Sequence, residues 1–221
     1  MPAYRRNKSK RGRRRRKAYI PRSPTLGLPI RKFVKMRYVQ NIVLDVGVAG
    51  IIAKYVFRAN SLFDPNLTGT GHQPMTFDQM SLFYNHYVVS GAKISVKAYS
   101  TQDAATVPAL VGIMVNDDTT TPSNFTEVLE QRKGRYSIVN PSQKAVSVYN
   151  TYSAKKFFNI TDVKDNLDRI GASIGDNPTD DAYFTIYALP MNGSTDIGAF
   201  NCVVTIDYTA HFSEPRDLAT S

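Results

Sequence analysis

Several segments of this chain place apolar residues at every second position, and the last of them shows the pattern most clearly. Between Phe200 and Phe212 the even-numbered positions are apolar, and the odd-numbered positions are polar except for Val203. A repeat of two puts successive side chains on opposite faces of a β-strand, whereas one face of a helix needs a repeat near 3.6. The pattern predicts a strand over 199–213 with one buried face, and it places the thiol of Cys202 in that face.

Seven further segments carry the alternation or the short apolar run that is typical of strands. They are 33–44, 51–59, 87–100, 107–115, 134–139, 144–151 and 182–189. The composition agrees, because the chain has 13 Tyr, 11 Phe and no Trp, and aromatic residues favour strands. Eight strands in about 180 residues suit a two-sheet sandwich. We expect an all-β fold, a single eight-stranded antiparallel jelly-roll sandwich with long inter-strand loops.

Three long polar connections separate these strands. The first, 60–83, ends in a helix predicted over 76–83, where Thr76 and Gln79 match a capping box. The second, 116–133, contains a helix predicted over 123–131, and the third, 155–180, is interpreted as a surface loop. Gly91 lies inside a predicted strand and indicates a bulge. Loops of this length are uncommon in an isolated domain, so we expect them to contact neighbouring subunits.

Charge divides the chain into two parts. Residues 1–44 hold 15 of the 28 Lys and Arg and no carboxylate, whereas the rest of the chain holds 13 Lys and Arg against 18 Asp and Glu, a formal balance of −5. Residues 1–32 lack apolar periodicity and repel one another electrostatically, so they cannot form a core. We expect a disordered basic arm over 1–32 and a folded domain over 33–221.

The arm carries the strongest functional signal. Ten of the thirteen residues from Arg5 to Lys17 are basic. A flexible polycation binds phosphates along a nucleic-acid backbone, tightly at low salt and without reading bases. We assign nucleic-acid binding to Arg5, Arg6, Lys8, Lys10, Arg11, Arg13, Arg14, Arg15, Arg16 and Lys17.

The same basic run has a second interpretation. Residues 13–17 fit a nuclear-localisation signal, which would bind nuclear import receptors. Both roles can belong to the same residues. Tyr4, Tyr19 and Phe33 flank the run; their rings could stack on unpaired bases or dock the arm on an apolar surface.

Catalytic, metal-binding and membrane patterns are weak. The histidines (His72, His86 and His211) lie near no Gly-x-Ser-x-Gly elbow, and a single cysteine excludes an intrachain disulfide and a thiolate-rich zinc site. Asp117–Asp118 and Asp180–Asp181 could help hold a hard cation, but paired acids in polar loops are usually solvated. No apolar run approaches the about 18 residues that span a bilayer. We expect no enzyme, no cofactor, no metal and no membrane insertion.

A series of short motifs follows the second predicted strand. They are Phe63-Asp64-Pro65-Asn66, Gly71-His72-Gln73-Pro74, Phe77-Asp78-Gln79, Tyr84-Asn85-His86-Tyr87-Val88-Val89 and Gly91-Ala92-Lys93-Ile94. Together with the arginine-rich N-terminal run and the eight predicted strands, this series resembles the capsid proteins of circular, Rep-encoding single-stranded DNA viruses, the circovirus-like group. The motifs match mainly over 57–97, and the architecture matches over the whole chain.

The resemblance implies a structural protein of the virion. Sixty copies of a single jelly roll would build a T=1 icosahedral shell, with the arm inside against a single-stranded circular DNA genome. The resemblance also implies delivery to the host nucleus and an outer surface that can meet a host-cell receptor. Sixty copies of residues 1–44, with 15 positive charges each, give about 900 positive charges, comparable with roughly a thousand phosphates.

Three alternatives remain open from the sequence. A non-assembling nucleic-acid-binding protein with a basic extension would need a basic surface on its body as well, and the balance of −5 disfavours that. A coat protein of a small RNA satellite virus could have the same arm and fold, so the choice of DNA rests on the resemblance. A β-sandwich enzyme or carbohydrate-binding domain is disfavoured by the absence of Trp and of a catalytic cluster.

Overall fold

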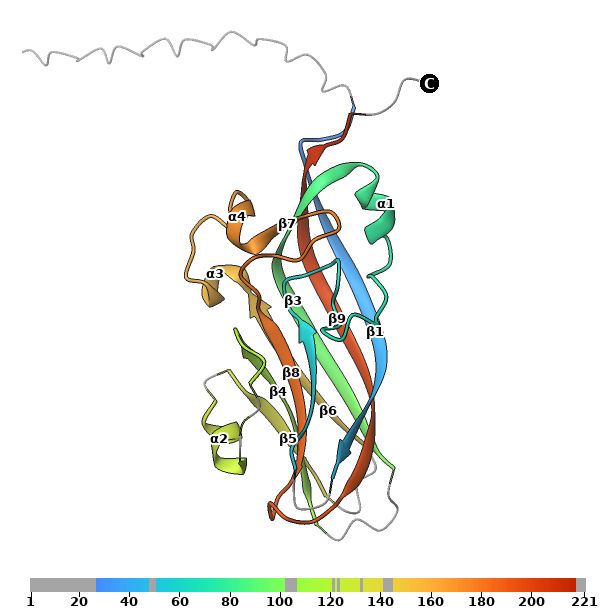
Figure 1. Cartoon of the computed structure of the whole chain (residues 1–221), viewed down its shortest axis with the longest axis vertical. Coiled ribbons are helices and arrows are strands. Elements are labelled where there is room, and N and C mark those ends of the chain that lie inside the picture. The colour runs from blue at the N-terminus through green and yellow to red at the C-terminus, as the bar shows by residue number, and fades with distance from the viewer. Residues whose placement is uncertain are drawn as a thin grey trace, which may run out of the picture.

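The two longest alternating segments, which are far apart in the sequence, lie side by side. In the computed structural model, which describes residues 27–47, 51–101, 107–120, 122, 124–131, 133–140 and 145–217, β1 (Arg31–Val46) pairs antiparallel with β9 (Gly198–Pro215) along its whole length. β9 also pairs with β3 (Tyr84–Ser100), and β3 pairs with β6 (Ala145–Ser153). These strands form sheet A in the order β1-β9-β3-β6, and the short β7 (Gly171–Ser173) adds to one end of β3 (Figure 1).

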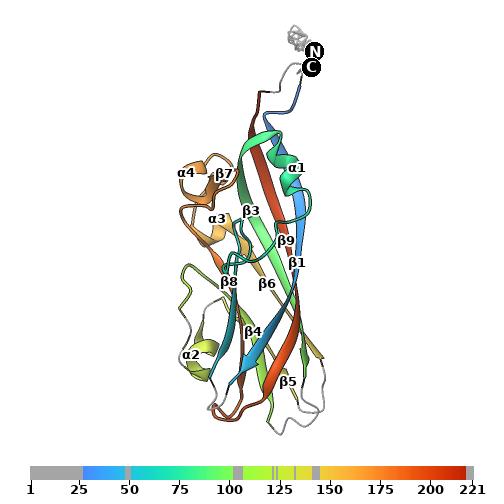
Figure 2. The same cartoon turned by 45° about the vertical axis from the view of Figure 1, so that its right-hand side comes forward.

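The remaining strands form a second antiparallel sheet, sheet B. Its members are β2 (Ala53–Arg58), β8 (Tyr183–Pro190), β4 (Ala109–Asn116) and β5 (Arg135–Val139), in the order β2-β8-β4-β5. The chain crosses between the two sheets at most steps, and the consecutive strands that share a sheet are β4 and β5 in sheet B and β6 and β7 in sheet A. Two sheets interleaved in this way, a five-stranded one that includes the short β7 and a four-stranded one, form a jelly roll, whose elongated body is seen in Figure 2.

The structure confirms the expected fold class and the eight predicted strands, each to within three residues at either end. The bulge predicted at Gly91 is present, because the pairing of β3 with β9 shifts register between Val89 and Gly91. The buried faces also agree with the alternation, since Met36, Tyr38, Ile42 and Leu44 of β1 are buried. Period two therefore predicted both the strands and the faces that they bury.

Buried aromatic side chains fill much of the space between the sheets, and the hydroxyl groups of two fully buried tyrosines bind backbone carbonyls. Tyr208 is fully buried and donates to the backbone carbonyl of Arg58 at 2.8 Å. Tyr87 is also fully buried and donates to the carbonyl of Asp176 at 2.8 Å. A buried Tyr stabilises the fold through its ring area only if its hydroxyl is hydrogen-bonded. These tyrosines meet that condition, so they stabilise the sandwich and also hold specific loops against it.

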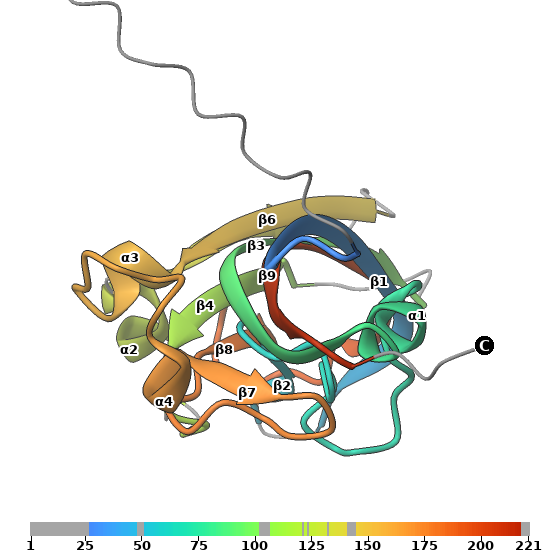
Figure 3. The same ribbon diagram turned by 90° about the horizontal axis from the view of Figure 1, so that it is seen from above.

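The outer faces of the two sheets differ in exposure. The connection after β4 carries α2 (Phe125–Glu130) across sheet B, where Val128 packs with Leu110, Met114, Tyr187 and Leu189 in a second small core. This cover explains why β4 and β8 are apolar at nearly every position. β1, β9 and β6 instead alternate between buried and exposed residues. Sheet A thus keeps a solvent-facing outer face, which forms one curved layer in the view along the long axis (Figure 3).

The interpretation of 155–180 as a loop is wrong in part. This segment contributes most of α3 (Ala154–Phe157), all of α4 (Leu167–Ile170) and β7. Ile170 is fully buried and joins the main core. Each of these elements has only three or four residues, which is too short for a period of 2 or 3.6 to show in the sequence.

The two predicted helices are present but shorter than expected. α2 begins after Asn124, whose side chain accepts a hydrogen bond from the backbone N–H of Glu127 at 2.9 Å. α1 spans Phe77–Ser81, but the predicted capping box at its start is wrong, because the side chain of Thr76 makes no cap hydrogen bond. Thr76 has φ 76°, whereas a capping residue needs an extended backbone to reach the helix N–H groups. Within the described residues, no helix is long and apolar enough to cross a membrane.

Candidate nucleic-acid interface

The predicted nucleic-acid-binding residues, Arg5 to Lys17, lie outside the described residues, as do Tyr4 and Tyr19. Their assignment stays a prediction. Phe33 is described: it stands 53% exposed on the outer face of β1, and its ring centroid lies 5.3 Å from that of His211 on β9. Phe33 therefore contacts sheet A and still leaves half of its surface free.

The described chain begins close to sheet A. The hydroxyl of Tyr84 donates to the carbonyl of Pro29 at 3.1 Å, and Arg31 forms an ion pair with Asp165. Arg31 then enters β1 opposite Ser213 of β9. These contacts hold residues 29–31 against sheet A, where β1 is an edge strand.

The register of sheet A gathers three basic side chains on its outer face. Arg37 of β1 stands opposite Asp207 of β9, which stands opposite Lys93 of β3. The neighbouring row starts with Lys35 on β1 and ends at Gly91 on β3. Side chains two residues apart on a strand share one face, so these residues surround one area of the sheet.

A hollow of about 760 Å³ lies in this area. The residues lining it from outward-facing positions are Lys35, Arg37, Gly91, Lys93, Thr151, Asp207 and Thr209. Gly91 has no side chain to fill the space, and the bulge beside it bends β3 locally. The hollow therefore follows from one glycine and one register shift, bordered by small threonines and long cationic side chains.

Cations outnumber anions in the hollow. The guanidinium of Arg37 donates to both carboxylate oxygens of Asp207, from Nε at 2.6 Å and from Nη2 at 3.1 Å. These hydrogen bonds and the charge of Asp207 raise the pKa of Arg37 above its usual value. Lys35 and Lys93 have no acidic partner within the described part of the chain. The formal charge of the lining is +2, which suits a bound phosphate.

An exposed aromatic ring stands beside the hollow. Tyr149 of β6 lies opposite Ser95, one row along from Lys93, and is 65% exposed. The ammonium group of Lys93 lies 5.6 Å from the centroid of the Tyr149 ring, within the range of a cation–π contact. A large aromatic side chain left this open can stack on a flat ligand.

The acidic residues of the body lie mostly elsewhere. Asp165, Asp168, Asp180 and Asp181 belong to the segment between β6 and β8. The balance of −5 covers only residues 45–221 and leaves out Lys35 and Arg37, so it did not indicate the cationic area on sheet A. The sequence signal that could have found it is the alternation of β1 and β3, which places Lys35, Arg37 and Lys93 on outward positions. Which strands are neighbours was not visible in that pattern.

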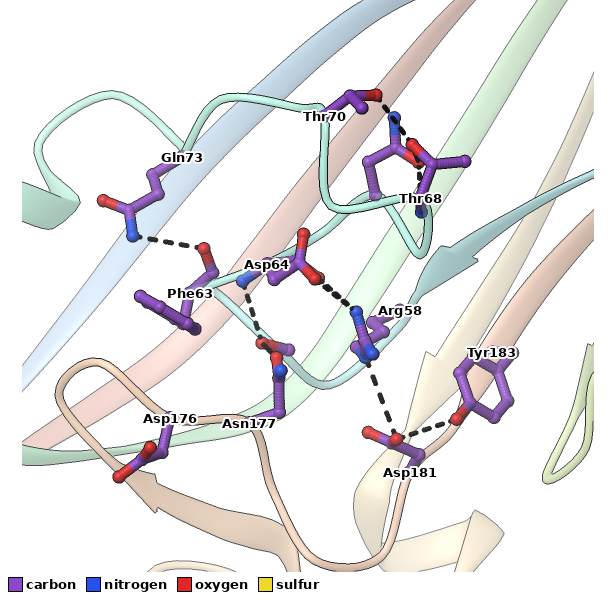
Figure 4. Close-up of polar contacts among 12 residues, drawn as sticks. Arg58, Phe63, Asp64, Thr68, Thr70, Gln73, Asp176, Asn177, Asp181 and Tyr183 are labelled. Carbon is purple, nitrogen blue, oxygen red and sulfur yellow. Dashed lines mark hydrogen bonds and ion pairs between the residues drawn. The ribbon is translucent and has the colours of Figure 1, made fainter.

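The motifs that carry the family resemblance form a structural network (Figure 4). Arg58 of β2 donates to the Asp64 carboxylate at 2.7 Å and lies 3.8 Å from that of Asp181, which also accepts from the Tyr183 hydroxyl at 2.7 Å. Gln73 donates to the carbonyl of Phe63 at 3.1 Å. These contacts hold the connection after β2 against the one before β8.

A second group of contacts holds the start of the same connection. The buried amide of Asn66 donates to the Tyr55 hydroxyl at 2.9 Å and accepts from the backbone N–H of Thr68 at 3.1 Å. Ser61 donates to the side-chain oxygen of Asn177 at 2.7 Å. These hydrogen bonds, within the loop, to β2 and to the distant Asn177, give the loop one fixed path, which is a structural role for the motif residues.

The histidines and the cysteine occupy separate places. His72 stacks on the ring of Tyr38 with the ring centroids 4.6 Å apart, and His86 Nδ1 lies 3.0 Å from Glu214. Burial, helped by Lys164 and Arg31, lowers the pKa of His211. Cys202 is buried as predicted, and burial raises the pKa of its thiol to about 12. A thiol with that pKa is not a nucleophile near neutral pH.

The paired acids are engaged in local contacts. Asp180 accepts from Arg169 at 2.7 Å, and Asp118 accepts from the backbone N–H of Thr120 at 2.8 Å. Among the residues that the structure describes, no three His, Cys, Asp or Glu side chains are grouped as metal ligands. These acids therefore stabilise turns and loops.

Comparisons with known proteins find similarity at the level of structure only. No family model and no curated protein matches the sequence. Among solved structures, the chain is similar to the decameric BFDV capsid protein (9% identity, TM-score 0.47, 82% of this chain and 99% of that one) and to Cocksfoot mottle virus (10%, 0.49, 83% and 94%). It is also similar to Desmodium yellow mottle tymovirus (17%, 0.40, all of both chains). The strand order of the chain itself defines its fold.

Proposed function

We propose that this chain is a viral coat protein that assembles into a closed shell and packages single-stranded nucleic acid through the basic residues from Arg5 to Lys17. One observation carries the proposal: residues 1–44 hold 15 cations and no carboxylate, whereas residues 45–221, which form the rest of the jelly-roll body, have a formal balance of −5. Such a body does not attract nucleic acid over its whole surface, so the polyanion is drawn to one side of it. A shell whose inner surface carries the arms would draw the nucleic acid to one side of each subunit in this way.

The contacts at the start of the described chain support this orientation. Pro29 and Arg31 are held against sheet A, and the cationic hollow lies on the outer face of the same sheet. In a shell, sheet A would then face the packaged polymer. The long connections, including the one that covers sheet B, would contact neighbouring subunits or form the outer surface.

The finer proposals rest on the sequence resemblance. They are a sixty-subunit T=1 shell, a circular single-stranded DNA genome, nuclear import through residues 13–17, and an outer surface that meets a host-cell receptor. Digestion of the packaged polymer with DNase or RNase, after the shell is opened, separates a DNA virus from a small RNA satellite virus. A shell diameter from electron microscopy tests the number of subunits.

Removal of residues 1–26 tests the proposal as a whole. This deletion spares the contacts of Pro29 and Arg31, so the body should keep its far-UV circular dichroism spectrum. The full chain should sediment as large particles with nuclease-protected nucleic acid, and the shortened chain should lose that nucleic acid. A full chain that stays a monomer at micromolar concentration with nucleic acid present would refute the shell.

A matched pair of variants separates charge from sequence in the arm. Changing the seven arginines of residues 5–17 to Lys keeps every charge, so packaging should survive with weaker bidentate contacts. Changing the same residues to Gln removes seven charges and should abolish packaging at physiological salt. Equal behaviour of the two variants would show that the arm does not act through its charge.

A second candidate function has one observation in its favour. A non-assembling nucleic-acid-binding protein needs a basic surface on its body, and the hollow on sheet A offers one. Sedimentation decides between the two, because such a protein would bind nucleic acid without forming particles.

A further inference from the structure

We propose that the hollow on sheet A is a second nucleic-acid site, specific for single strands, which holds phosphate on Lys35 and Lys93 and stacks one base on Tyr149. The inference rests on the proposed function, because it names the ligand of the surface that would face the packaged polymer. It goes beyond the arm, which binds any polyanion, to a site on the folded body that distinguishes single strands from duplexes.

The arrangement of the cations fits a phosphate backbone. Lys35 and Arg37 are two residues apart on β1, so their Cα atoms are about 7 Å apart. Lys93 stands two strands away across β9, a distance of about 10 Å. A backbone crossing the hollow can therefore reach a cation from either side, and the small side chains of Thr209 and Thr151 leave room for it.

The carboxylate of Asp207 does not cancel this site. It is held by both hydrogen bonds from Arg37 at 2.6 Å and 3.1 Å, so its charge is matched within the pair. Lys35 and Lys93 stand on opposite sides of that pair and supply the excess charge. Asp207 also fixes the direction of the Arg37 guanidinium, which leaves its three remaining N–H bonds able to donate to a phosphate oxygen.

The Tyr149 ring supplies the preference for single strands. It is 65% exposed and has Lys93 beside it. Bases of a single strand can leave their stack and lie on an aromatic ring, whereas the faces of bases in a duplex are already covered. An acidic peptide would use the lysines equally well but would gain little from the ring, so the ring favours nucleic acid.

Fluorescence anisotropy with the full chain tests the site. The probes are labelled dT and rU 20-mers and a duplex of the same length, with salt varied from about 0.2 M to about 0.6 M so that the electrostatic share of binding is known. Tyr149→Ala should weaken single-strand binding about tenfold at each salt concentration without changing the slope of log K against log salt. Tyr149→Phe keeps the ring and should stay within about twofold of the wild type.

The lysine variants give the complementary result. Lys35→Gln with Lys93→Gln should lower the salt slope by about 1.4, since each phosphate contact contributes about 0.7 on a single strand. Duplex binding should respond to the lysine changes and not to Tyr149→Ala. Tyr149 is exposed, so its replacement leaves the core intact, and an unchanged circular dichroism spectrum verifies this.

The outcomes separate this inference from the proposed function. Unchanged affinity in Tyr149→Ala, or displacement of dT by poly-glutamate as readily as by unlabelled dT, would overturn the site while packaging through the arm stands. If the full chain does not assemble into shells but Tyr149→Ala still weakens single-strand binding, the shell is refuted and the site on sheet A stands. Equal effects on dT and rU support recognition of single strands as a class, and an effect confined to one of them assigns the site to DNA or to RNA.

Discussion

Replacing Gly112 with Ala tests the packing between sheet B and the segment with α2 that covers it. A Cβ at this position would lie 2.3 Å from Cζ and Oη of Tyr187 and 2.7 Å from its Cε2. Tyr187 is fully buried and packs in the second core with Leu110, Met114, Val128 and Leu189. The ring cannot move aside without disturbing these neighbours, so the added methyl group must displace packed atoms.

Two opposing effects set the change in the free energy of unfolding that Gly112→Ala causes. Overpacking of a close-packed core costs about 1–3 kcal/mol. Ala also restricts the unfolded chain more than Gly does, which stabilises by about 0.4–1 kcal/mol where the backbone accepts it. Gly112 is not among the glycines with positive φ, so that gain applies. The net expectation is a destabilisation of about 1–2 kcal/mol, or a fall in Tm of about 2–8 °C for a domain of this size.

Urea unfolding followed by far-UV circular dichroism measures this difference, at a concentration where the chain is not assembled. Gly47→Ala is the matched control, because a Cβ there meets nothing within 4 Å, and it should be neutral or slightly stabilising. Tyr187→Leu removes the clashing ring atoms, so in the double variant the cost of Gly112→Ala should fall by at least about 1 kcal/mol. Equal stability of Gly112→Ala and Gly47→Ala would refute the contact with Tyr187.

Two further predictions concern titratable groups. Cys202 is buried with its pKa raised to about 12, so a thiol reagent at pH 7.5 should label it only as fast as the protein unfolds, and rapid labelling of the native chain would contradict its burial. The pKa of His211 is lowered by burial and by Lys164 and Arg31, so the unfolded chain takes up this proton first. Stability is then complete above the unfolded value near 6.5 and falls as pH drops below it. His211→Gln should lose less stability than the wild type between pH 7 and pH 5 in urea titrations, and parallel losses would show that His211 does not contribute.

The elements that the sequence predicted correctly share one property: their signal lies within a few consecutive residues. The alternation from Phe200 to Phe212 is complete within one strand, and so is the alternation in β1. The segment 155–180 was misread because its elements are short and their apolar residues pack on distant parts of the core. Thr76 was misread because the capping pattern names residue types, whereas the backbone at φ 76° decides whether the side chain can cap.

The candidate interface shows the same division. The arm from Arg5 to Lys17 is a continuous run, so its chemistry is visible without any structure. The hollow is not, because Lys35 and Lys93 come from strands that are joined only through β9, near the other end of the chain. The formal balance of −5 also gave no sign of it, since it was taken over residues 45–221 and leaves out Lys35 and Arg37.

The sequence by itself determined the eight longer strands, which face of each alternating strand is buried, and that a polycationic segment precedes an acidic remainder of the chain. These are local properties, set by the period of the backbone and by the composition of short segments. Only the tertiary structure decided that β9 lies between β1 and β3, that sheet B is covered while sheet A is open, and that Tyr149 stands beside Lys93. Those relations depend on hydrogen bonds and packing between residues far apart in the chain, and no local pattern encodes which strand becomes the neighbour of which.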